Sequence, residues 1–91
     1  MDHVVNRETA AMKGFSSQSC SIADEMEDVC SHLRQLLYAA NDYMQDQSGQ
    51  EALSIVAELV EETMAMADSM RCLAQRIKRS AELLEESDQL L

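Results

Sequence analysis

Apolar residues recur three and four positions apart along two long stretches of the chain. In the first stretch the row runs through Met12, Phe15, Ser19, Ile22, Met26, Val29, Leu33, Leu36, Ala40 and Tyr43. In the second stretch it runs through Val56, Val60, Thr63, Ala67, Met70, Ala74, Ile77, Ala81 and Leu84. This spacing places each row along one side of an α-helix, whereas a half-buried strand would alternate at every second residue. The pattern therefore predicts two long helices and an all-α fold.

Further apolar residues widen both rows. The first row is flanked by Cys20, Cys30 and Leu37, and the second is accompanied by a parallel row of Leu59, Met66, Leu73 and Leu83. An apolar face this broad requires more than one packing partner. We therefore expect the two helices to pack on each other and also on a second protein.

Residues 48–51, Ser-Gly-Gln-Glu, interrupt the pattern between the two stretches. Ser48 followed three residues later by Glu51 matches a capping box, in which both side chains bind backbone N–H groups at a helix start. The predicted boundaries are helix one at about 8–44, a turn at about 45–48 and helix two at about 49–88, in a single domain spanning 1–91. So short a connection predicts an antiparallel helical hairpin, and dimerisation of two hairpins would form a four-helix bundle.

The charged residues are consistent with this hairpin. If the chain folds back near Gln47, Arg71 lies across from Asp24 and Glu25. Surface ion pairs contribute less than about 1 kcal/mol each, so such a pair would select the helix register more than it would stabilise the fold.

Composition narrows the classes of protein and partner. The chain is 46% apolar but has one Phe, two Tyr and no Trp, so its core must consist of aliphatic residues and Met. Seventeen acidic against seven basic residues give a net charge of −10, which argues against binding to nucleic acid. No apolar run approaches the roughly 20 residues that cross a bilayer, so we expect no stable membrane insertion. The N-terminus lacks the basic start and apolar stretch of a general secretory signal, so we expect a cytoplasmic protein whose export would use another route.

No arrangement of residues predicts catalysis or a cofactor. Gly14 and Gly49 stand far apart, so there is no glycine-rich phosphate loop. His3 and His32 have no partner at the spacing of metal ligands or of a catalytic base. We therefore expect neither an enzyme nor a cofactor or metal site.

The three cysteines, Cys20, Cys30 and Cys72, all fall inside the apolar-periodic stretches. We interpret them as small buried apolar residues. A Cys20–Cys72 or Cys30–Cys72 disulfide is the alternative interpretation.

The pattern of the whole chain resembles the WXG (ESAT-like) family, the small helical-hairpin proteins of type VII secretion in Gram-positive bacteria. The Trp-x-Gly turn of that family would fall on Gln47, Ser48 and Gly49, with Gln47 in the place of the tryptophan. Its aromatic-x-x-x-acid secretion signal would fall on Leu84 to Asp88, with Leu84 in the place of the aromatic residue. Hairpins without the full signals resemble accessory proteins that pair with the helical N-terminal domain of a larger toxin.

The resemblance implies that the protein acts by packing on a partner. It would dimerise with a related hairpin or a toxin's helical domain, shield apolar helix faces, and help present a composite signal to the secretion ATPase. The predicted interface consists of Ile22, Met26, Val29, Leu33, Leu36, Val56, Leu59, Val60, Met70, Leu73 and Ile77. The alternative is a stand-alone homodimeric helical bundle that serves as an adaptor or scaffold.

Overall fold

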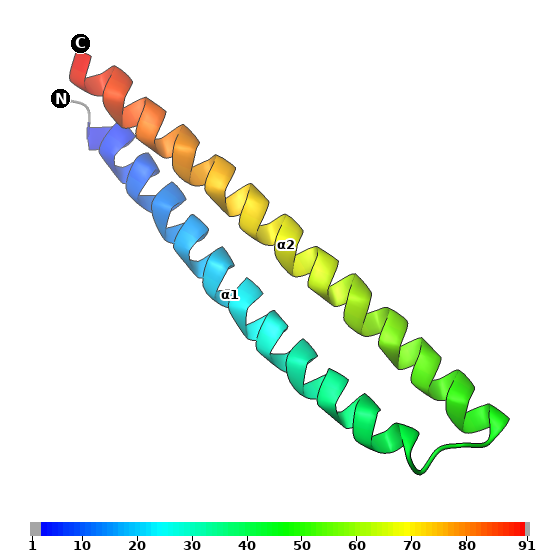
Figure 1. The fold of residues 1–91 in the computed structure, drawn as a ribbon. Helices are drawn as coiled ribbons and strands as arrows, with labels where there is room; N and C mark the ends of the chain where they lie inside the picture. The colour runs from blue at the N-terminus through cyan, green and yellow to red at the C-terminus, as the bar shows by residue number, and fades with distance from the viewer. Residues whose placement is uncertain (1–2, 91) are drawn as a thin grey trace.

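The computed structural model describes residues 3–90, with their side chains from Val5 onward. Two helices, α1 (His3–Asn41) and α2 (Gln47–Leu90), run antiparallel and are joined by a short turn. The start of α1 and the end of α2 lie together at the end of the hairpin opposite the turn (Figure 1). The predicted all-α helical hairpin is therefore confirmed for the described residues. Residues 1, 2 and 91 of the predicted domain lie outside them.

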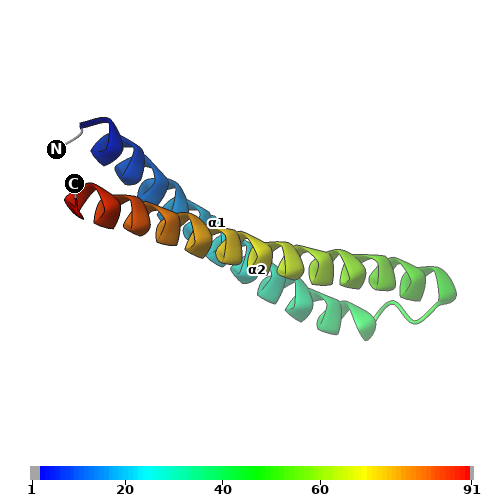
Figure 2. The same cartoon turned by 90° about the horizontal axis from the view of Figure 1, so that it is seen from above.

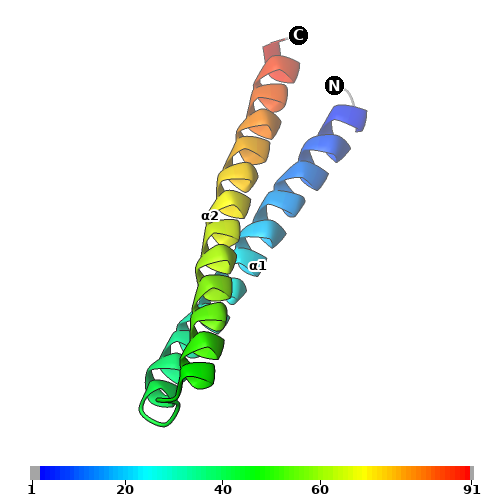
Figure 3. The same ribbon diagram turned by 90° about the vertical axis from the view of Figure 1, so that its right-hand side faces the viewer.

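The hairpin is a thin rod. It measures 68 × 14 × 14 Å and has a radius of gyration of 20.2 Å, whereas a compact domain of this length has a radius of about 12 Å. Views from two further directions show the helices crossing at a shallow angle and moving apart toward the chain ends (Figures 2 and 3). Because the rod is only two helices thick, each helix keeps a broad exposed surface along its length.

The helices meet along a row of mostly small residues spaced by seven, which we call the small-residue seam. On α1 the seam consists of Thr9, Ser16, Ala23 and Cys30, and on α2 of Val60, Ala67, Ala74 and Ala81, all of them buried. The distance between two packed helices depends on the side chains at their contact, so these residues let the backbones approach closely. The fold is consequently held by close contact along a line and not by a deep core.

Two hydrogen bonds across the seam set the register of the helices. The Ser16 hydroxyl donates to the carbonyl oxygen of Ala74 at 2.8 Å. The Cys30 thiol, a weak donor, lies 3.8 Å from the carbonyl oxygen of Val60. Both bonds fit one antiparallel register, and in that register Ala23 lies opposite Ala67, midway between them.

The predicted row on α1 divides between two environments. One half faces α2 and is partly buried beside the seam: Met12, Ser19, Met26, Leu33 and Ala40. The other half is exposed: Phe15, Ile22, Val29, Leu36 and Tyr43. The structure places the smaller neighbours of these exposed residues in the seam, because only small side chains permit the close helix approach. On α2 the prediction matches the seam, since Val60, Ala67, Ala74 and Ala81 are all buried.

The turn differs from its predicted form. Helix α1 ends at Asn41 and α2 begins at Gln47, so the connection lies earlier than the predicted 45–48. The N-cap is Asp46, whose carboxylate accepts a hydrogen bond of 3.1 Å from the backbone N–H of Gly49. Ser48 lies inside the first turn of α2 and Glu51 pairs with the side chain of Gln47 at 3.3 Å, so the predicted Ser48–Glu51 capping box is wrong. Asp caps a helix as well as Ser does and adds a negative charge at the positive end of the helix dipole.

Gly49 is required at the turn because its surroundings leave no space for a side chain. A Cβ atom at this position would lie 2.5 Å from Asp46 Oδ1 and 2.9 Å from Met44 Cβ. Its backbone conformation is ordinary, since the described residues contain no glycine with positive φ. The glycine therefore allows the N-cap carboxylate and the turn to close onto the helix start.

The three cysteines are free and occupy different environments. Cys30 is buried in the seam, Cys20 is partly buried and Cys72 is exposed, so the expectation of three buried cysteines is wrong for Cys72. Cys30 lies opposite Val60, and 12 residues of helix, about 18 Å, separate that level from Cys72. This distance rules out a Cys30–Cys72 disulfide within the hairpin.

Within the described residues, neither helix contains an apolar stretch of the length and hydropathy needed to span a membrane.

Candidate functional site

One long side of the rod carries exposed apolar residues from both helices, which we call the apolar edge. On α1 it consists of Phe15, Ile22, Val29 and Leu36, which are 50–64% exposed. On α2 it consists of Leu59, Met66 and Leu73, which are 52–58% exposed. A stripe of this kind on both helices is larger than the isolated apolar residues found on any soluble surface, and such stripes mark sites of protein interaction.

Helix geometry places the two rows on the same side of the rod. Each residue of the apolar edge directly precedes a residue that points at the other helix, as Ile22 precedes Ala23 and Met66 precedes Ala67. One step back along an α-helix turns a side chain by about 100°. Because the helices run in opposite directions, this turn brings both rows to the same side. The apolar edge is therefore one continuous surface and not two separate stripes.

The opposite side of the rod carries the ion pairs that join the helices, and we call it the ion-paired edge. Many of its residues, such as Glu27, Arg71 and Glu85, follow a seam residue by four positions, which turns them away from the apolar edge. The pairs are Lys13–Glu85 at 2.5 Å, Arg34–Glu61 at 2.6 Å, Arg71–Glu27 at 2.5 Å and Arg71–Asp24 at 2.7 Å. One edge is thus paired within the hairpin, while the side chains of the apolar edge stay half or more exposed.

Arg71 is the centre of the ion-paired edge. Its guanidinium donates to Glu27 and Asp24 on α1 and lies 3.5 Å from Asp68 on its own helix. The hydrogen bonds with Glu27 and then Asp24 raise the pKa of Arg71 further above its ordinary value. The predicted position of Arg71 across from Asp24 is confirmed, and this cluster adds to the register that the seam sets.

The residues predicted for the interface divide between the two environments. Five lie on the apolar edge: Ile22, Val29, Leu36, Leu59 and Leu73. Val56 is at the margin of exposure, and the other five are buried or partly buried between the helices: Met26, Leu33, Val60, Met70 and Ile77. Sequence reasoning left out Phe15 and Met66, although both continue heptad rows that were visible in the sequence.

The residues of the predicted secretion signal lie on the last turns of α2, which continues to Leu90. Leu84 is 43% exposed. Asp88 is partly buried and lines a depression with Asn6 of α1. The predicted acid is therefore part of the helix and lies close to the start of α1, instead of standing free in a terminal turn.

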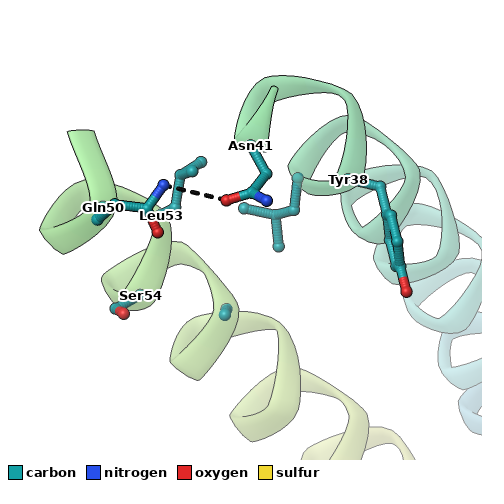
Figure 4. Close-up of a pocket in the computed structure, with 7 residues that line it drawn as sticks. Tyr38, Asn41, Gln50, Leu53 and Ser54 are labelled. Atoms are coloured by element: carbon teal, nitrogen blue, oxygen red, sulfur yellow. Dashed lines mark hydrogen bonds between the residues drawn. The ribbon is translucent and has the colours of Figure 1, made fainter. Parts of the chain in front are cut away.

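A shallow, open depression lies beside the turn, between the end of α1 and the start of α2 (Figure 4). Its volume is about 410 Å³ and its lining residues are Leu37, Tyr38, Asn41, Gln50, Leu53, Ser54 and Ala57. The Gln50 side chain donates to Asn41 Oδ1 at 3.0 Å and to the carbonyl oxygen of Met44 at 2.6 Å. These bonds tie the start of α2 to the end of α1, and the lining contains no charged group that could serve as a catalyst.

Residues 3–90 also contain no group of three His, Cys, Asp or Glu side chains placed to hold a metal ion. The predicted turn motif of Gln47, Ser48, Gly49 and Glu51 has its residues together at the start of α2. The only bond among their side chains that the structure shows is the one from Gln47 to Glu51. The apolar edge is therefore the strongest candidate for a functional surface in the described part of the chain.

No protein-family model, no curated protein and no solved structure matches this chain.

Proposed function

We propose that this protein is a packing partner for another helical protein and supports its export through a type VII secretion system. The observation that carries the proposal is the apolar edge, a continuous exposed surface along both helices. The hairpin shape, the short turn with Gly49 and the acidic composition support it through the resemblance to the WXG family. In this role the protein has no catalytic group and acts by covering a surface.

The physical basis of the role is burial of apolar area. A partner hairpin, or the helical N-terminal domain of a toxin, lies along the apolar edge and completes a four-helix bundle. Each apolar Å² removed from water contributes roughly 25 cal/mol, less the cost of association. Export then depends on the pair, because the partner's apolar helix faces stay covered until they reach the secretion machinery.

The recognition element in this proposal lies at the end of α2. Leu84 and Asp88 stand where the family carries its secretion signal, and the exposed side chain of Leu84 is available to a receptor. The pair of proteins would present this segment together with the partner's own residues to the secretion ATPase. Removal of residues 84–91 tests this part: export of the partner should fall, and unchanged export of both proteins would refute the signal.

Co-expression with the products of neighbouring genes tests the packing role itself. A toxin with a long helical N-terminal domain, or a second small hairpin protein, should co-purify with this chain and require it for export. Leu73→Lys on the apolar edge should abolish co-purification. Gln75→Lys, two residues away on the ion-paired edge, is the matched control and should have no effect. Equal binding by both variants would contradict the proposal.

A stand-alone homodimeric adaptor or scaffold is the second candidate. The observation that favours it is the register of the hairpin, which the seam and the Arg71 cluster set without any partner. A chain that is fully folded and heat-resistant by itself, and that has no partner among its gene neighbours, would favour this candidate. A chain that folds fully only when co-expressed would favour the export role.

A further inference from the structure

Acidic residues are missing from one stretch of each helix. The sequence contains no Asp or Glu in residues 9–23 of α1 or in residues 69–81 of α2. The hydrogen bond from Ser16 to Ala74 joins the two stretches, so they lie at the same level of the rod. We call them together the acid-free band. Its 13 residues on α2 give it a length of about 20 Å, since an α-helix rises 1.5 Å per residue.

The acid-free band is basic in a chain whose net charge is −10. Acidic residues begin directly at both of its ends, with Glu8 and Glu82 on one side and Asp24 and Asp68 on the side of the turn. Five of the seven basic residues of the chain lie within the band: Lys13, Arg71, Arg76, Lys78 and Arg79. The rod therefore reads acidic, basic, acidic along its length.

One step of the ion-paired edge inside the band lacks a carboxylate. Lys13 and Arg71 each pair with a glutamate of the opposite helix, and these two pairs stand 14 residues apart along both helices. Halfway between them the same register places Cys20 opposite Lys78. A thiol thus stands where the neighbouring steps have a carboxylate, and Lys78 makes no ion pair with any described residue.

A hollow of about 440 Å³ lies at this step between the helices. Its lining includes Ser17 of α1 and Gln75 and Lys78 of α2, which are all exposed and carry groups that donate hydrogen bonds to a carboxylate. Glu82 also lines the hollow, at the outer end of the band, and lies 3.6 Å from Arg79. An incoming carboxylate beside Lys78 would complete the row of ion pairs.

The surroundings of the hollow limit what can bind there. The large exposed apolar residues of the band, Phe15, Ile22 and Leu73, all belong to the apolar edge. A helical partner packs through an apolar stripe, which the ion-paired edge of the band does not offer. The net charge of −10 repels long polyanions such as nucleic acid. The acidic ends also confine an anionic ligand to about 20 Å, which about six residues of an extended chain span.

We propose that the hollow at Lys78, with Arg79 beside it, binds a short, extended acidic segment of a partner protein. About six Asp or Glu residues match the length of the band, with one carboxylate beside Lys78. Basic residues on both sides of that acidic block meet the acidic ends of the rod. This surface lies on the ion-paired edge, opposite the surface assigned to the export partner, so the inference goes beyond the packing role and does not depend on it.

Two fluorescent peptides of identical composition test the charge pattern. The first has six glutamates between two runs of three lysines, and the second has six lysines between two runs of three glutamates, so the net side-chain charge of both is zero. Fluorescence anisotropy at low salt should show the first peptide binding the full chain about tenfold or more tightly, because like charges meet in the second complex. Added salt should weaken this binding. Equal binding of both peptides, or binding of neither, would overturn the proposal, and so would an oligonucleotide that binds as tightly as the first peptide.

Charge reversal at Lys78 tests the residue at the centre of the hollow. Lys78→Glu should weaken binding of the first peptide by about tenfold, whereas Lys78→Arg should retain it. Arg7→Glu is the matched control: Arg7 is exposed, lies outside the band and changes the net charge by the same amount, so the affinity should stay within about twofold. Circular dichroism checks that all three variants stay helical. Equal losses in Lys78→Glu and Arg7→Glu would show that only the overall charge matters and would overturn the site.

Alkylation of Cys20 locates the contact. Its thiol is free and partly buried, and it lines the hollow, so a bound peptide covers it. Iodoacetamide should modify Cys20 more slowly when the first peptide is present at a saturating concentration, and at an unchanged rate with the second, as measured by mass spectrometry. An unchanged rate with the first peptide would place it elsewhere and overturn the hollow as its site. The export role fails separately, when no partner requires this chain for secretion.

Discussion

The close approach of the helices at the centre of the seam makes Ala67→Leu the sharpest test of the fold. Ala67 and Ala23 are both fully buried and face each other in the register set by the Ser16 and Cys30 bonds. Leucine adds three carbon atoms where the facing residue is already as small as a side chain can be without becoming glycine. The helices must then separate, and the neighbouring layers of the seam lose their contacts.

The expected loss of stability follows from measured effects of overpacking. Inserting methylene groups into a tightly packed contact costs typically about 1–3 kcal/mol. With a urea dependence of about 1 kcal/mol/M for a small protein, a loss of 2 kcal/mol lowers the unfolding midpoint by about 2 M. Leucine is nearly as good a helix former as alanine, so helix propensity contributes little to this loss.

Urea unfolding followed by far-ultraviolet circular dichroism measures the loss, at one fixed protein concentration because association shifts the midpoint. Ala65→Leu is the matched control, since Ala65 is exposed on the same helix and its substitution should change stability by less than about 0.5 kcal/mol. Combining Ala67→Leu with Ala23→Gly should give a favourable coupling of about 0.5–3 kcal/mol, because glycine restores space opposite the leucine. If Ala67→Leu proved as stable as Ala65→Leu, the close small-residue seam described above would be wrong.

Three further predictions follow from the turn, the ion-paired edge and the largest buried side chain. Gly49→Ala should lower the free energy of unfolding by about 1 kcal/mol, because the added Cβ displaces the Asp46 cap, whereas Gly14→Ala, with open space around it, should raise it by roughly 0.5–1 kcal/mol. Arg71→Gln should lower the urea midpoint more than Arg79→Gln, because Arg71 pairs with α1 whereas the ion pair of Arg79 is with Glu82 on its own helix. Equal midpoints would show that Arg71 does not help to set the helix register. Val60→Ala removes two methyl groups from a side chain that is 1% exposed, so the free energy of unfolding should fall by about 1–2 kcal/mol in the same assay. An unchanged urea midpoint would contradict the burial of Val60.

The two helices and their antiparallel packing could be predicted because they depend on local patterns. A spacing of three and four residues defines one side of a helix whatever the tertiary contacts are. The absence of proline and the few residues between the two stretches leave little alternative to a hairpin. The opposite charges of Arg71 and Asp24 were found in the same way, because the position of the turn fixes which residues of two antiparallel helices face each other.

The start of α2 shows where two local signals compete. Ser48 and Asp46 are both good N-cap residues, and the sequence around Ser48 also matches a capping box. Asp46 caps the helix, whose first residue is Gln47, and Gly49 leaves room for the Asp46 carboxylate and for Met44. The atoms that crowd position 49 belong to Asp46 and Met44, three and five residues earlier, and their positions depend on the folded path of the turn, which no spacing rule along the chain reports.

Sequence periodicity determined that each helix has a broad apolar side, but it did not determine which part of that side the hairpin uses. On α1 the sequence put Phe15, Ile22 and Val29 in one apolar row with residues that face α2, whereas their small neighbours Ser16, Ala23 and Cys30 form the seam. The reason is physical: a contact between two helices gains most when the backbones come close along their whole length, which selects small residues over large ones. The large apolar residues are left on the outside as the apolar edge. Only the packed structure separates the surface that holds the hairpin together from the surface that remains free to bind.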